Sequence, residues 1–266
     1  MIPNHVTAEM RKLAMLRYPC EAVFAYWADG TWRELVNTGE APRDMFALSP
    51  SDNRLLEQSP PLVLVHSHCK GPDSARPSDE DTLSQFDAGY TWGIICVSGW
   101  TDNLGKHHFN SCTGPEYFGA HRPHEPLLGR SYLWGVRDCY TLVQGYYAQQ
   151  GIVIPSVPKV FAPLREAPSH KFAHKPFDYW IEELGLWDEI KPWNAEPGDA
   201  VTYRLTHHFR DHCAVFLGES KYLEQRGTSL SCIKHHNEAY LEKKGARYYR
   251  LKGYNAQDRA LWQIKE

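Results

Sequence analysis

The chain has 266 residues, a formal net charge of -3 and a sequence pI near 6.5. Because 42% of the residues are hydrophobic and 13% aromatic, it can fill one large or two small cores, which excludes an intrinsically disordered protein. The near-neutral charge gives no electrostatic basis for nucleic-acid specificity or for binding an anionic membrane surface.

The cysteines indicate a reducing compartment. There are seven, at scattered spacings and without a C-x-x-C pair, so they do not form a disulfide framework. Near Arg11, Lys12 and Arg17 there is no apolar signal-peptide core. The longest apolar runs are strand-sized, well below the ~18 residues of a membrane span. We therefore expect a protein made in a cytoplasm, without a membrane span.

The first part of the chain predicts a mixed α+β domain. Apolar residues at helical spacing favour a helix over 7–18, with Thr7 as its N-cap and Tyr18-Pro19 as its end. The elements expected after it are strands at 21–28, 32–36 and 62–68, a short helix at 80–90 and a buried strand at 91–100.

Residues 101–128 are rich in glycine and proline and show little periodicity, which indicates a connection between domains. We therefore expect an α+β protein with two domains. The predicted divisions are a first domain at 1–105, a linker at 106–125, a second domain at 126–253 and a polar tail at 254–266.

The second domain opens with a predicted helix over 138–150 that Asp138 can cap and that ends at Gly151. A second helix is expected over 177–184. The turn Pro197-Gly198-Asp199 precedes a strand, "AVTYRL". The runs "HCAVFLG" and "KYLEQR", joined through Gly218-Glu219-Ser220, predict a hairpin.

A polar stretch, "HSHCKGPDSARPSDED", follows the apolar strand at 62–65. Since side chains alternate along a strand, His66 and His68 point to the same side. Two imidazoles at a strand end can share a metal, and a catalytic zinc takes three protein ligands and one open position. Asp81 is our candidate for the third ligand, with Asp79 and Glu80 as competitors.

The upstream Glu21, the H-x-H pair and the S-x-x-D of Ser78 and Asp81 together resemble the JAMM metalloprotease (catalytic MPN) domain, an α-β-α fold. The resemblance covers about residues 5–100. It implies that His66, His68 and Asp81 hold Zn²⁺, that Glu21 is the general base and that Ser78 stabilises the oxyanion. The loop from His68 to Ser78 is longer than the family's usual spacing.

A second candidate site contains a thiol. Cys139 lies at the start of the predicted helix, where the helix N-terminus favours a thiolate. "DCYTLV" followed by "DHCAVFLG" resembles the NlpC-type papain-like cysteine peptidases over about 126–235. The resemblance implies Cys139 as nucleophile, His212 as base and Glu224, where many relatives have histidine, as the residue that orients the base. Gln225 is the alternative if the register differs by one. The resemblance also implies Tyr132 at the oxyanion, with the Cys139 amide as the other donor.

The remaining candidates have structural interpretations. By strand alternation, Cys213 faces away from His212 into the core. We expect surface or loop positions for four histidines, and core positions rather than a cleft for two tryptophans. These are His207, His208, His235 and His236, and Trp134 and Trp193.

The order of the two domains resembles the lambda-type phage tail tip assembly protein K family over nearly the whole chain. That family implies a tail-tip or hub protein of a siphophage and a peptidase directed at peptidoglycan stem peptides. Its partners would be other tail-tip and hub proteins, and it would be made in the host cytoplasm and carried in the virion tail tip. Two alternatives stay open: a structural assembly protein with inactive sites, or a cytoplasmic JAMM-type isopeptidase.

Overall fold

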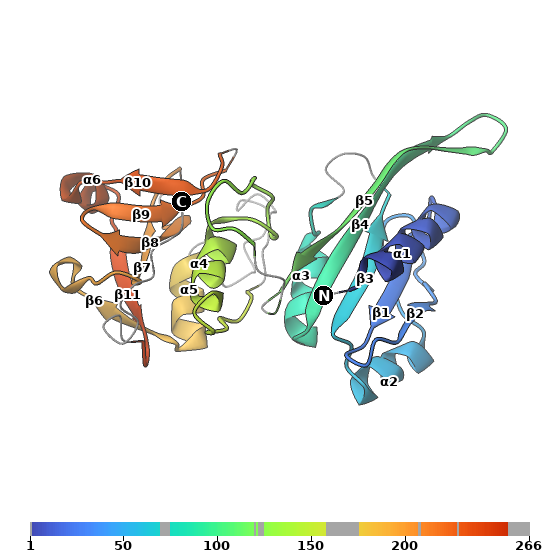
Figure 1. Cartoon of the computed structure of the whole chain (residues 1–266), viewed down its shortest axis with the longest axis horizontal. Helices are drawn as coiled ribbons and strands as arrows, with labels where there is room; N and C mark the ends of the chain where they lie inside the picture. Colours follow the sequence, from blue (N-terminus) through green and yellow to red (C-terminus); the bar gives the residue numbers. More distant parts are fainter. Residues whose placement is uncertain are drawn as a thin grey trace. The chain divides into compact units, whose positions relative to one another are not determined.

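The computed structural model describes residues 2–69, 75–119, 121, 125–157, 176–206, 209–227 and 229–254. The chain forms two compact units, Met1–Pro123 and His124–Glu266, and each contains its own β-sheet and helices (Figure 1). The mixed helix and strand content expected from the sequence is confirmed. Within the described residues, every helix is too short or too polar to cross a membrane.

The first unit is built on a five-stranded sheet in the order β2-β1-β3-β4-β5. Strands β3 and β4 are parallel, and the other pairs are antiparallel. The strands are β1 (Val23–Tyr26), β2 (Trp32–Leu35), β3 (Val63–His68), β4 (Thr91–Thr101) and β5 (His107–Phe118).

The two faces of this sheet have different roles. One face packs on helix α1 (Asn4–Arg17), where Met10 and Ala14 join Val65 in a buried core. Because side chains alternate along β3, the residues on either side of Val65 face the opposite way, toward helix α3 (Asp79–Ala88). His66 is therefore on the α3 face of the sheet, and it is fully buried there.

The helices of the first unit differ in two ways from the sequence prediction. Helix α1 begins at Asn4, so Thr7 is a buried residue of the first turns whose N–H donates to the Pro3 carbonyl, and its predicted capping role is wrong. Helix α2 (Pro50–Gln58), capped by Ser49, was not predicted. Its buried residues are only Asp52 and Leu56, too few to give a helical apolar pattern.

The predicted linker at 106–125 is wrong for most of its length, because β5 spans His107–Phe118 there. This edge strand is largely exposed, so it lacks the apolar alternation that marks a strand. Its register shifts where Gly114, with a φ of 91°, and Pro115 interrupt the pairing with β4. Glycine and proline in a strand are typical of an edge or a bulge.

The second unit has a six-stranded antiparallel sheet in the order β10-β9-β8-β7-β11-β6. The strands are β6 (Trp187–Ile190), β7 (Ala200–Tyr203), β8 (His212–Gly218), β9 (Lys221–Glu224), β10 (Cys232–His235) and β11 (Arg247–Leu251). The helices are α4 (Cys139–Ala148), α5 (Pro176–Leu184), a 3₁₀ turn at Pro192–Asn194 and α6 (Glu238–Lys243). The predicted tail at 254–266 lies outside the described residues except for its first position.

Helix α4 and the β8–β9 hairpin confirm the sequence prediction and position the second site. Asp138 caps α4 by accepting from the Thr141 N–H, so Cys139 is the first helical residue. The hairpin turns at Gly218, Glu219 and Ser220, all with positive φ. That left-handed turn fits the strand twist and brings β9 alongside β8.

Candidate functional site

The first unit brings together three donor groups that the sequence had placed in one metal site. The Nε2 atoms of His66 and His68 lie 2.9 Å apart, and each lies 3.2 Å from a different carboxylate oxygen of Asp81. All three groups are buried or half-buried, and their donor atoms lie within 4.8 Å of one another. The strand end and the start of α3 therefore converge on one point.

A capping box holds Asp81 in place. Ser78 is the N-cap of α3, and its Oγ accepts from the Asp81 N–H at 3.0 Å, while Asp81 Oδ2 accepts from the Ser78 N–H at 2.8 Å. Burial raises the pKa of Asp81, but the two histidines outweigh it and hold that pKa well below its usual range. Asp81 is thus a carboxylate, and the Ser78 hydroxyl hydrogen is left to donate elsewhere.

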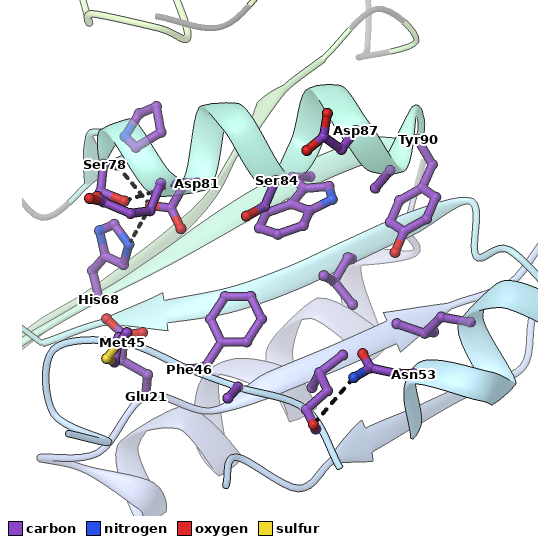
Figure 2. Close-up of a pocket in the computed structure, with 18 of the residues that line it drawn as sticks. Glu21, Met45, Phe46, Asn53, His68, Ser78, Asp81, Ser84, Asp87 and Tyr90 are labelled. Atoms are coloured by element: carbon purple, nitrogen blue, oxygen red, sulfur yellow. Dashed lines mark hydrogen bonds and ion pairs between the residues drawn. The ribbon is translucent and has the colours of Figure 1, made fainter. Parts of the chain in front are cut away.

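The other candidates of this site lie around the cluster. Asp79 and Glu80 line the adjoining cavity, but the close group of donors contains Asp81. Glu21 is buried, lines the same cavity and lies beside His68 in Figure 2. Its charge contributes to raising the pKa of the Cys69 thiol to about 12, after the larger effect of burial.

The donor set fits zinc. Imidazole nitrogen and carboxylate oxygen bind Zn²⁺ at roughly 2.0–2.2 Å, and donors around a tetrahedral ion at those distances are separated by about 3.3 Å. The shortest separations here, 2.9 and 3.2 Å, match that spacing. A histidine that binds a metal usually donates its other ring N–H to an acceptor. The buried Nδ1 of His66 has no such acceptor among the described residues.

Replacing His66 with alanine is expected to remove most of any zinc that the cluster binds, because two ligands hold an ion far less tightly than three. Metal content per chain, read by atomic emission after dialysis, measures this. The alkylation rate of Cys139 should stay unchanged, and His5→Ala, an exposed histidine of α1, is the matched control. Loss of Cys139 reactivity together with zinc would contradict two independent sites.

In the second unit, Cys139 and His212 come together where α4 packs against β8. Hydrogen bonds from Cys213 and then from His212, with the imidazole charge, lower the pKa of Cys139 well below its usual value despite burial. Burial also opposes the charge on His212, but Cys139 and Glu224 outweigh it and raise the pKa of His212 to about 9. Both shifts favour a thiolate beside an imidazolium.

Glu224 lies on β9 next to the imidazole. His212 Nε2 is 3.4 Å from Glu224 Oε2, and both side chains are almost completely buried. Burial raises the pKa of Glu224, yet its bonds with His212 and Tyr203 and the charge of Arg226 lower it to about 2. A carboxylate is thus held beside Nε2 of the imidazole, where it favours the protonated ring.

Three further residues hold Glu224, and none was identified as such from the sequence. The Tyr203 hydroxyl donates to the carboxylate, Arg226 Nε lies 2.9 Å from Oε1, and His236 Nε2 lies 3.2 Å from Oε2. His236 lies in the loop just after β10, as predicted, but its side chain is only 10% exposed and contacts Glu224. Arg226 stands two positions after Glu224, a strand spacing that could have suggested the pair. No local pattern points to His236, which reaches the site from the end of β10.

Gln225, the alternative to Glu224, faces a different partner. It accepts from Arg130 Nε at 2.8 Å and donates to the Arg130 carbonyl at 2.9 Å. Arg130 Nη2 also donates to the Asp138 carbonyl and to Thr141 Oγ1, both at 2.9 Å. One buried guanidinium thus ties the start of α4, and with it the nucleophile, to the end of β9.

Replacing Arg130 with methionine is expected to lower the free energy of unfolding by about 2–4 kcal/mol. Methionine keeps a long unbranched side chain at this position, but the buried acceptors lose the guanidinium that donates to them. Chemical unfolding followed by tryptophan fluorescence measures this. Arg247→Met is the matched control, since Arg247 pairs with Glu189 at an exposed surface and should change stability by less than about 0.5 kcal/mol. Equal effects of the two substitutions would contradict the structural role of Arg130.

The remaining candidates fall into three groups. Cys213 is buried as expected, but its thiol hydrogen-bonds to Cys139, so the prediction that it faces away from the site is wrong. Tyr132 lies beside Gly227 just beyond β9, and its oxyanion role remains a prediction. Trp193 is 78% exposed and is therefore not a core residue. Trp134 is half-buried, and His235 is exposed as predicted. His207 and His208 lie outside the described residues.

Comparison with known proteins gives a family match within the second unit. Residues 129–250 match the model of the NlpC/P60 family. Tail tip assembly protein K of Escherichia phage lambda is 26% identical over 195 residues, which cover 69% of this chain and 79% of that protein.

Two solved structures are similar to part of this chain, but both superpose on it with low TM-scores. RipD of Mycobacterium tuberculosis, described as a non-catalytic NlpC/p60 domain protein adapted to peptidoglycan binding, is 17% identical with a TM-score of 0.28, over 48% of this chain and 78% of that one. The P60 domain of an M. avium paratuberculosis antigen is 20% identical with a TM-score of 0.26, over 46% and 71%. The sequence matches, rather than these superpositions, carry the comparison: residues 129–250 of the second unit match the NlpC/P60 family, in a mixed α/β chain that is similar to a phage tail assembly protein.

Proposed function

We propose that this chain is a tail-tip protein of a siphophage that hydrolyses amide bonds of peptidoglycan stem peptides. The observation that carries this proposal is the group formed by half-buried Cys139 with buried His212 and Glu224, in which the pKa shifts favour the charged thiol and imidazole that a cysteine peptidase needs. The similarity to a phage tail assembly protein and the NlpC/P60 match supply the biological setting.

The proposed reaction at Cys139 is acyl transfer. The thiolate attacks the scissile carbonyl carbon, and the negative charge that develops on its oxygen is stabilised by the Cys139 N–H, free at the start of α4, and by the Tyr132 hydroxyl. His212 then gives its proton to the leaving amine as the C–N bond breaks. In the second half, His212 takes a proton from water, which hydrolyses the thioester and releases the thiolate.

We propose a second amide-hydrolysing site at the zinc-type cluster of the first unit, as the JAMM pattern implies. A bound zinc would lower the pKa of a bound water and polarise the scissile carbonyl. His66, His68 and Asp81 would hold the ion, Glu21 would accept the proton of the attacking water, and Ser78 would donate its hydroxyl hydrogen to the oxyanion. The burial of Glu21 beside the cluster and the capping geometry of Ser78 support these roles.

The test is digestion of purified peptidoglycan sacculi, with and without a chelator, and mass spectrometry of the soluble products. Release of cut stem peptides supports the proposal and identifies the bond. Dependence on the metal would add the first site to that activity.

A structural assembly protein with inactive sites is the competing function, favoured by the name of the lambda relative, a tail tip assembly protein. Under that alternative the chain would bind other tail-tip and hub proteins during assembly in the host cytoplasm. No released product, together with binding of tail proteins, would establish it. A phage carrying Cys139→Ala separates the two functions again, because an enzyme-only role leaves tails built but poorly infective.

A further inference from the structure

A cavity of about 1250 Å³ adjoins the zinc-type cluster in the first unit. Figure 2 shows Ser78, Asp81 and His68 at one end, and Asp87 and Tyr90 toward the other. One wall is the side of α3, and the other includes the segment 44–48. A ligand that reaches the cluster through this cavity therefore runs along α3.

The inner lining of the cavity includes two aromatic rings. The rings of Phe46 and Trp92 lie with centroids 5.8 Å apart and provide an apolar surface. Trp92 is 5% exposed, and its buried Nε1–H has no acceptor among the described residues. Trp92 therefore offers a ligand the apolar part of its ring.

The far end of the cavity is acidic. Glu57 and Asp87 are both exposed and line the cavity, and Asp79 and Glu80 add negative charge nearer the cluster. Among the lining residues the structure describes, Arg76 is the one arginine and there is no lysine. This balance attracts a cationic group and repels an acidic one.

The spacing of residues along α3 gives the distance between the cluster and the acidic end of the cavity. Asp81, Ser84 and Asp87 stand three residues apart, on one side of the helix, and all line the cavity. With a rise of about 1.5 Å per residue, Asp87 is roughly 9 Å from Asp81 along the axis. An extended peptide advances about 3.3 Å per residue, so this distance corresponds to about three peptide residues.

We propose that the cavity binds an extended peptide with a lysine-like amino side chain about three residues from the amide bond presented to the cluster. Asp87 and Glu57 are the ionic partners of that amino group, and Phe46 and Trp92 contact the apolar part of the peptide. The inference rests on the function proposed for the first unit, and it adds the class of peptide that this site selects.

The test uses fluorescein-labelled peptides with lysine, norleucine or glutamate three residues before or after a central residue. Binding is measured by anisotropy at low salt with the full-length zinc-loaded chain carrying Glu21→Gln and Cys139→Ala, which prevents cleavage. We expect the lysine peptide of one orientation to bind about fivefold tighter than its norleucine counterpart, since each exposed ion pair contributes little. Adding Asp87→Asn and Glu57→Gln should remove that preference.

The matched control replaces two exposed carboxylates outside the cavity, with Glu9→Gln and Glu40→Gln, and should keep the preference. Equal binding of all peptides, or no binding, overturns the inference. Hydrolysis is followed separately with Glu21 restored. Metal-dependent cleavage without a charge preference leaves the proposed function standing and removes the inference, whereas charge-dependent binding without cleavage supports the cation site and removes the proposed hydrolase activity there.

Discussion

Replacing Cys139 with alanine is expected to reduce release of soluble muropeptides from purified sacculi by at least about 10³-fold, because the substitution removes the atom that forms the acyl intermediate. The fold should persist, since Asp138 still caps α4 through the Thr141 N–H and alanine is the best helix former. Mass spectrometry of the supernatant, with wild type run in parallel, measures the effect.

Cys112→Ala is the matched control, a half-buried cysteine of the first unit, and it should leave release unchanged. His66→Ala and chelator treatment report on the other site in the same assay. If the Cys139→Ala chain still released product and chelator stopped it, cell-wall cleavage would belong to the zinc-type cluster, and the role proposed for Cys139 would be wrong.

Replacing Glu224 with glutamine is expected to lower kcat at Cys139 by about 10²–10⁴-fold, by analogy with removal of the orienting carboxylate of a catalytic triad. Glutamine keeps the size of the side chain, but it cannot balance the imidazolium of His212 or the guanidinium of Arg226. Breaking a buried ion pair on one side also costs about 3–5 kcal/mol of stability. Steady-state kinetics on a stem-peptide substrate measure the first effect, and chemical unfolding measures the second.

The same substitution should change the pH profile in a direction that a purely structural role would not produce. In the wild type the pKa of His212 is raised to about 9, so the imidazolium persists up to that pH and activity falls above it. Since Glu224 contributes to this raised pKa, its loss lowers it, and the alkaline limb of the profile should move to lower pH. Unlike the overall rate, this shift depends on the charge next to the imidazole.

Glu242→Gln removes an exposed carboxylate from α6 in the same unit and should leave both kcat and the pH profile as in the wild type. A Glu224→Gln chain that loses activity only in proportion to its loss of folded protein, with an unmoved alkaline limb, would contradict the electrostatic role of Glu224.

The sequence predicts best those features that depend on residues close together in the chain, such as helix caps and strand ends. Asp138 before Cys139 is a helix cap, and His212 begins the strand that follows, so the ends of both elements could be predicted. The Ser78–Asp81 spacing is likewise that of a capping box, although the sequence favours Asp81 over Asp79 and Glu80 because S-x-x-D resembles the JAMM pattern.

The partners of Glu224 depended on tertiary structure. Tyr203 stands directly across from His212 in the β7–β8 register, and His236 reaches the carboxylate from beyond β10, which is itself a strand the sequence did not indicate. Strand β5 was missed for a related reason: an exposed edge strand has no buried face to impose alternation. Propensity and periodicity do not report contacts between elements that pair over long distances.

The position of β11 has a consequence for synthesis. This strand, the last one described, lies inside the second sheet between β7 and β6, and it pairs with the strand that carries Tyr203. While the ribosome has yet to deliver residues 247–251, β7 has an open edge, whereas the first unit can already be complete because domains fold as they emerge. Until β11 is added, the strand that carries Tyr203, a partner of Glu224, therefore has one unpaired edge, so the surroundings of the thiol site depend on residues more than 100 positions after Cys139.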